Sequence, residues 1–132
     1  MPTGIARYIP DWSVPSNPGA NVVATATRPA SPAPQLAESR HVCTSITAVF
    51  TAGATAPTAA TATVNLRDGA SGAGTILASF TIGVEATAGR TTLLELCALE
   101  IIGSPNTAMT LEFTAAGGAN TFQSVTLTGH TL

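Results

Sequence analysis

Apolar and polar residues alternate along most of the chain from His41 to the C-terminus. Within 59–67, alanine, valine and leucine fall on one side of an extended chain, and threonine, asparagine and arginine fall on the other. A period of two is the pattern of a β-strand with one buried face. The pattern predicts strands over 41–51, 59–67, 75–84, 108–115 and 120–132.

The alternation also predicts which side chains form the core. Phe50, Phe80, Leu111 and Phe113 all fall on the inward faces of their strands. Ile76 shares the inward register of Phe80. In the last predicted strand the apolar register shifts after Phe122, which indicates a bulge near residue 123.

Two segments between these strands need separate interpretation. The loop DGASGAG (68–74) resembles a phosphate loop only in its glycine content, since it lacks the lysine and the following helix. We expect it to be a flexible hairpin tip. The apolar segment 91–103 also fits a helix, but glycine and proline around it and strands on both sides favour a strand buried on both faces.

Short strands joined by glycine-, asparagine- and proline-containing turns predict an all-β fold. We expect an antiparallel β-sandwich or jelly-roll-like domain over residues 41–132. The chain has no lysine, a residue that often protects exposed strand edges. We therefore expect the edges to be covered by the N-terminal arm or by another subunit.

The first 40 residues differ in composition. Seven of the nine prolines lie in the first 34 residues. Because proline fixes φ and lacks a backbone donor, this region cannot be a helix or a central strand. We interpret residues 1–40 as an extended proline-rich arm, in which only 20–27 could pair as an edge strand.

The arm carries the only tyrosine and the only tryptophan of the chain. Aromatic side chains are favoured at the centres of protein interfaces. We expect the arm to dock on a neighbouring chain, with folding back onto its own domain and a disordered tail as the alternatives. The candidate partner-binding residues are Ile5, Arg7, Tyr8, Ile9 and Trp12.

Charge excludes some functions. Only 9% of the residues are charged, and the net charge is −2 with a pI near 5.5. The five arginines are scattered, so we expect no nucleic-acid binding.

We also expect no membrane span, because no long apolar run occurs. The N-terminus lacks the pattern of a signal peptide, so we expect synthesis in a cytoplasm without export by the general route.

Few residues are candidates for metal binding or catalysis. We expect Cys43 and Cys97 to be buried free thiols, with a disulfide as the alternative. Together with His41 and His130 they could form a zinc site, but their spacing matches no short metal motif. No nucleophile motif or paired carboxylates can be recognised. We therefore expect no catalytic residues, no cofactor and no metal.

Three stretches carry a family resemblance: VNLRDGASGAGTIL (64–77), EIIGSPNTAMTLEF (100–113) and AAGGANTFQSVTLTGHTL (115–132). In their pattern of strand and turn residues and in their composition they resemble small β-sandwich structural proteins of tailed bacteriophages. The resemblance implies a non-enzymatic virion protein that decorates or cements a capsid. Its implied partners are the major capsid protein or other virion subunits, and further copies of itself in a homo-oligomer. The alternatives are a phage adsorption or carbohydrate-binding module, and a head-to-tail or tail component.

Overall fold

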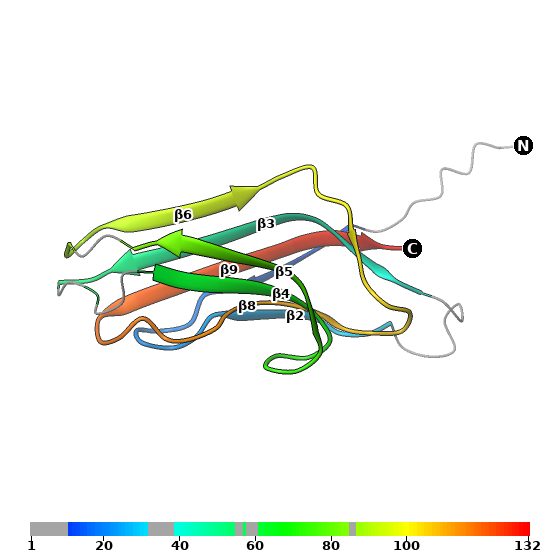
Figure 1. The fold of residues 1–132 in the computed structure, drawn as a ribbon, viewed down its shortest axis with the longest axis horizontal. Helices are drawn as coiled ribbons and strands as arrows, with labels where there is room; N and C mark the ends of the chain where they lie inside the picture. Colours follow the sequence, from blue (N-terminus) through cyan, green and yellow to red (C-terminus); the bar gives the residue numbers. More distant parts are fainter. Residues whose placement is uncertain (1–10, 32–38, 55–56, 58–60, 85–86) are drawn as a thin grey trace, which may run out of the picture.

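The computed structural model describes residues 11–31, 39–54, 57, 61–84 and 87–132. These residues form strands and connecting turns without a helix, and the strands build two facing antiparallel sheets (Figure 1). The predicted all-β, antiparallel sandwich is therefore confirmed. The strands are β1 (Asp11–Ser16), β2 (Thr25–Arg28), β3 (His41–Ala52), β4 (Thr61–Asp68), β5 (Thr75–Gly83), β6 (Thr91–Leu96), β7 (Ile101–Ile102), β8 (Met109–Phe113) and β9 (Thr121–Thr131).

Each sheet combines strands from distant parts of the sequence. The first sheet has the order β1-β9-β3-β6, and the short β7 also pairs with β3. The second sheet has the order β2-β8-β4-β5. Long strands β3 and β9 pair over almost their whole length in the middle of the first sheet. β8 and β4 occupy the middle of the second sheet.

The core lies between the two sheets and follows the predicted alternation in most strands. Phe50, Leu111 and Phe113 are fully buried, and the rings of Phe50 and Phe113 lie 6.3 Å apart in a tilted arrangement. The prediction that Phe80 is a core residue needs correction, because Phe80 is only half-buried. It points inward as predicted, but β5 is an edge strand, so only part of its ring is covered.

The register of β5 differs from the prediction at its start. A bulge between Leu66 and Arg67 shifts the pairing with β5, so that Ile76 lies opposite Arg67. Arg67 lies on the outer face of the sheet, where it contacts a carboxylate of β8. Ile76 therefore turns outward and is 48% exposed, whereas the sequence predicted it to be inward.

The bulge predicted near residue 123 is absent from β9. Gln123 continues the inward face of a regular strand, and Phe122 points outward. Gln123 is buried because both ends of its amide are bonded to segments beside the second sheet. It accepts a hydrogen bond from the backbone of Ala24 (3.1 Å) and donates one to the carbonyl of Ala115 (2.8 Å). A polar side chain thus links the two sheets from within the core.

The ambiguous segment 91–103 is extended, as predicted, but it is broken in two. β6 and β7 both pair with β3, and Ala98 between them adopts a positive φ of 56°. The expectation of burial on both faces was wrong. β6 is an edge strand with alternating exposure, and its Leu93 is 57% exposed.

The predicted boundary between an arm and a domain at residues 40 and 41 also needs correction. β1 pairs with β9 in the first sheet, and β2 pairs with β8 in the second. β2 overlaps the segment that the sequence allowed as an edge strand. Pro15 fits within β1 because an edge strand needs backbone donors on one side only. The sandwich therefore includes strands from both halves of the proline-rich region.

Candidate functional site

Trp12, the aromatic residue predicted to anchor the arm on a neighbour, is buried in its own domain. It lies on β1 with its side chain turned toward the core, and it is only 8% exposed. Gly129 of β9 lies directly opposite it. A Cβ atom at Gly129 would lie 2.8 Å from the Trp12 ring and 2.0 Å from the carbonyl oxygen of Val42. The absence of a side chain at Gly129 therefore makes room for the indole.

A chain of hydrogen bonds holds the indole in place. Nε1 of Trp12 donates to Oγ1 of Thr131 at 3.0 Å. The same hydroxyl lies 2.8 Å from Nδ1 of His41, and Nε2 of His41 lies 2.8 Å from the carbonyl oxygen of Pro29. Because this carbonyl can only accept, Nε2 carries the hydrogen, and in the neutral ring Nδ1 accepts from Thr131. The polar ring atoms of the two buried residues, Trp12 and His41, thus all have partners.

Two ring contacts complete the packing around Trp12. The His41 ring meets the indole edge-on, with centroids 5.5 Å apart. The guanidinium carbon of Arg28 lies 5.6 Å from the indole centroid, within the range of a cation–π interaction. Trp12 thus joins β1 to β2, β3 and β9. These contacts favour the alternative that this part of the arm packs on its own domain.

The remaining predicted anchors are Ile5, Arg7, Tyr8 and Ile9, and they lie outside the described residues. They directly precede β1, whose first residue, Asp11, is paired with His130 near the C-terminus. Trp12 is the second residue of that strand. Any contact made by residues 1–10 therefore starts from a point that is fixed on the sandwich.

The cysteines and histidines do not come together. Cys43 and Cys97 are both free thiols, as expected, and the disulfide alternative is not formed. Cys43 is buried, and burial raises the pKa of its thiol to about 11, against a weaker opposing effect of a hydrogen bond to Ser45. Cys97 is exposed, contrary to expectation, because it follows the edge strand β6. Within the described ranges, no three histidine, cysteine or carboxylate groups are placed to hold a metal.

The glycine-rich loop 69–74 joins β4 to β5 as a hairpin, as predicted, and it also makes contacts that the sequence did not predict. The loop folds over the outer face of the second sheet, where Glu112 of β8 receives three hydrogen bonds. They come from Nε of Arg67 at 2.5 Å, from the hydroxyl of Ser71, and from the backbone of Gly72 at 3.1 Å. Gly74 has a φ of 78°, and a Cβ there would meet the carbonyl of Asp68, so the turn requires glycine.

Glu112 is charged at neutral pH despite its burial. Burial by itself raises the pKa of this carboxyl group. The hydrogen bonds from Ser71, Gly72 and Arg67, together with the charge of Arg67, outweigh burial and hold the pKa below its ordinary value. Sequence analysis missed this site. Alternation places Glu112 on an outer face, but nothing local indicates that a loop 40 residues earlier covers it.

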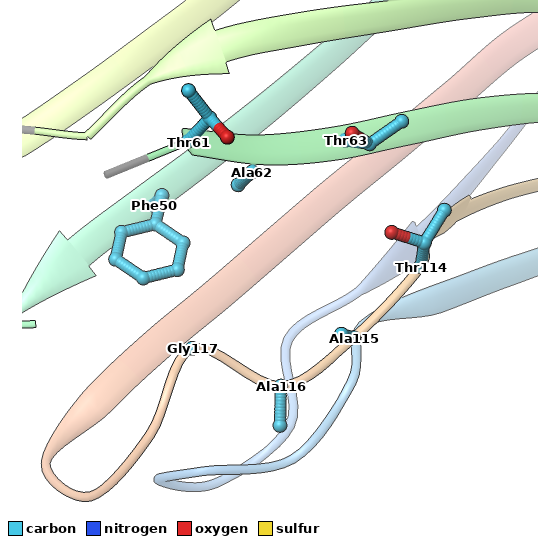
Figure 2. Close-up of a pocket in the computed structure, with 8 residues that line it drawn as sticks. All are labelled: Phe50, Thr61, Ala62, Thr63, Thr114, Ala115, Ala116 and Gly117. Atoms are coloured by element: carbon cyan, nitrogen blue, oxygen red, sulfur yellow. The ribbon is translucent and has the colours of Figure 1, made fainter. Parts of the chain in front are cut away.

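A shallow hollow opens at one end of the sandwich (Figure 2). The ring of Phe50 forms part of its wall, and a Cβ at Gly117 would lie 2.2 Å from that ring. The hollow holds about 100 Å³, whereas sites for small organic ligands usually measure roughly 300–1,000 Å³. Its polar side chains are threonines. Its lining residues are Phe50, Thr61, Ala62, Thr63, Thr114, Ala115, Ala116 and Gly117.

The described part of the chain contains no helix that could cross a membrane.

Comparison with solved structures gives distant similarities. No family model and no curated protein matches the chain. An arabinose-bound α-L-arabinofuranosidase aligns at 18% identity with a TM-score of 0.41, over 98% of this chain and 20% of that one. The disulfide-linked pili of Bacillus endospore appendages align at 13% identity with a TM-score of 0.23, over 90% and 85% of the two chains. The chain spans about a fifth of the arabinofuranosidase, and neither similarity bears on function.

Proposed function

We propose that the chain is a non-enzymatic structural protein of a tailed-phage virion, where it decorates or cements the capsid. Its partners are the major capsid protein or other virion subunits, and it is a homo-oligomer. The resemblance of its strands and turns to small phage β-sandwich proteins supports this proposal. So does a surface in which threonine, serine and alanine replace most charged residues.

The observation that carries the proposal is the fixed start of β1. Trp12 is buried against β9 and is hydrogen-bonded to Thr131, so the strand is secured at its first residues. Residues 1–10 are therefore joined to an anchored point on the sandwich. Ile5, Tyr8 and Ile9 bring apolar and aromatic surface to that segment, and Arg7 brings a charge that can pair with a carboxylate of a neighbour.

The mechanism depends on where the protein is placed on the capsid and on which subunits it connects. The sandwich sits over a junction between capsid subunits, and residues 1–10 reach across to a neighbouring subunit. Each contact is weak, but a protein that binds only the assembled shell stabilises that shell by mass action. Many copies on one particle add their effects.

Co-sedimentation with empty capsids tests the proposal. We expect the full chain to sediment with capsids and a variant lacking residues 2–9 to remain in solution, although its sandwich is folded. Tyr8→Ala should weaken attachment by about tenfold or more if Tyr8 is an interface hot spot. Thr3→Ala in the same segment is the matched control and should bind like the full chain.

Two results would overturn the proposal. Undiminished sedimentation of the truncated variant would remove the role of residues 1–10. Binding to host cells or to a glycan array, with none to capsids, would assign the chain instead to adsorption or carbohydrate recognition.

A further inference from the structure

The edge strands on the two sides of the sandwich differ in how they are protected. On one side lie β1 and β2. β1 contains Pro15, and β2 is only four residues long and is followed by Pro29. Proline and short length are both devices that prevent an edge from pairing with another chain. This side is therefore poorly suited to strand addition.

The opposite side is formed by β5 and β6, which lie near each other in the two sheets (Figure 1). Neither strand contains proline, and Glu95 of β6 is the single charged residue in the two of them. In the described part of the chain, nothing pairs with the outer edge of either strand. Such an edge presents free backbone donors and acceptors, and it is a ready template for another strand.

β5 is the better template of the two. It is nine residues long, and Thr75–Gly83 includes no charged residue. At about 3.4 Å per residue, it offers an edge of roughly 30 Å. Ile76 is 48% exposed and Phe80 is half-buried, so apolar surface accompanies the free backbone.

The charge pattern favours a second copy of this chain as the occupant. When a strand pairs antiparallel with its own copy about a two-fold axis, a charged residue is brought near the same residue of the copy only where it lies close to the axis. β5 has no charged residue, so no register of self-pairing brings like charges together, whereas Glu95 disfavours the registers of β6 that are centred near it. Threonine, serine and apolar side chains on β5 also form favourable cross-strand pairs.

We propose that β5 pairs antiparallel with β5 of a second copy, joining the two β2-β8-β4-β5 sheets into one continuous sheet. This pairing gives the homo-oligomer of the proposed function a defined interface and rests on that proposal. It needs only the purified chain, so it can fail or hold independently of attachment to a capsid.

Analytical ultracentrifugation of the purified full chain tests the pairing. We expect a dimer at micromolar concentrations for the unmodified chain. The double variant Ile76→Lys with Thr81→Lys places charges on the edge and should be monomeric, with an unchanged circular dichroism spectrum. Ser13→Lys, an exposed position on the protected edge strand β1, is the matched control and should remain dimeric.

Hydrogen exchange on the unmodified chain gives a second test that needs no variant. In the dimer, alternate amides of β5 that face away from β4 should exchange slowly, and dilution to the monomer should release them. A chain that is monomeric throughout the micromolar range overturns the pairing. So does a dimer in which these amides exchange rapidly, or one that only Ser13→Lys dissociates. A dimer that does not bind capsids overturns the proposed function and leaves the pairing intact.

Discussion

The side chain of Glu112 connects β8 to a loop that lies about 40 residues earlier in the sequence. Its carboxylate collects hydrogen bonds from Arg67, Ser71 and Gly72, and these contacts place the glycine-rich loop on the outer face of the second sheet. Gly69 at the start of the loop is also bonded to the hydroxyl of Thr110 and to the carbonyl of Ala108, so Glu112 is one of several contacts that position the loop.

The lowered pKa of Glu112 makes a prediction about acid stability. A group whose pKa is lower in the folded protein stabilises the fold above its ordinary pKa, near 4.5, and this contribution is lost as the pH falls through the folded value. Glu112→Gln should reduce the free energy of unfolding at pH 7 by about 1–3 kcal/mol. Its stability should also fall less between pH 5 and strongly acidic pH.

Chemical denaturation at a series of pH values measures both effects. Glu95→Gln, at an exposed position, is the control and should behave like the unmodified chain. Parallel pH profiles for Glu112→Gln and the unmodified chain would contradict the assignment.

Gly129 gives a second prediction at this scale. A methyl group there would overlap the carbonyl oxygen of Val42 and press on the ring of Trp12. We expect Gly129→Ala to destabilise the protein by about 1–3 kcal/mol, because a packed core cannot absorb the added volume without shifting its strands. Thermal unfolding compares it with Gly19→Ala, where nothing lies within 4 Å of the added atom. Equal melting temperatures would show that Val42 on β3 and Trp12 on β1 can both move to make room for the methyl group.

Among the elements, the long strands β3, β4, β5, β8 and β9 could be predicted from the alternation of the sequence, whereas the register at the start of β5 could not. Leu111 and Phe113 are core residues as expected, because β8 is regular and central. Ile76 was misplaced, because an extra residue in one strand reverses the faces of all residues beyond it. A bulge forms where two paired strands contribute different numbers of residues, and the sequence of either strand alone does not show this mismatch.

The proline-rich region was misread for a related reason. Proline correctly excluded helices and central strands, but it did not exclude edge strands, and both β1 and β2 are edges. Trp12 was therefore assigned to an intermolecular contact that its burial now argues against. Of the candidate anchors, the four residues before β1 remain predictions.

Two truncations separate the strands of this region from the segment that precedes them. Removal of residues 1–9 should leave the melting temperature nearly unchanged. Removal of residues 1–35 deletes β1 and β2, and with them the buried side chains of Trp12, Ala24 and Ala26. Because burying one large aromatic side chain stabilises a core by about 3–5 kcal/mol, we expect the shorter protein to be unfolded. Circular dichroism distinguishes the two, and a folded product of the longer deletion would restore the original boundary.

For the whole molecule, the pairing of β1 with the last strand and of β2 with β8 makes the sandwich one cooperative unit. Two probes of the chain report on different parts of it. Trp12 is the single tryptophan and lies on β1, and Cys43 is a buried thiol on β3. Both residues belong to the same core cluster.

We therefore expect the denaturant midpoint from tryptophan fluorescence to coincide with the midpoint for labelling of Cys43 by a thiol reagent. The variant Cys97→Ser removes the exposed thiol, so that only Cys43 is labelled. An earlier fluorescence transition would show that β1 detaches before the rest of the sandwich unfolds.

The antiparallel pairing of β1 with β9 also determines how the molecule responds to tension. Asp11 enters the sandwich beside His130, and six consecutive residue pairs join the two strands. A pull on the preceding residues, directed outward along the strand, stresses all six pairs in shear at the same moment instead of peeling them apart one by one. A molecule held through its N-terminal end would thus resist extraction through all six residue pairs of β1 and β9 together. The C-terminus lies at this same end, so a label fused there would sit beside the attachment point.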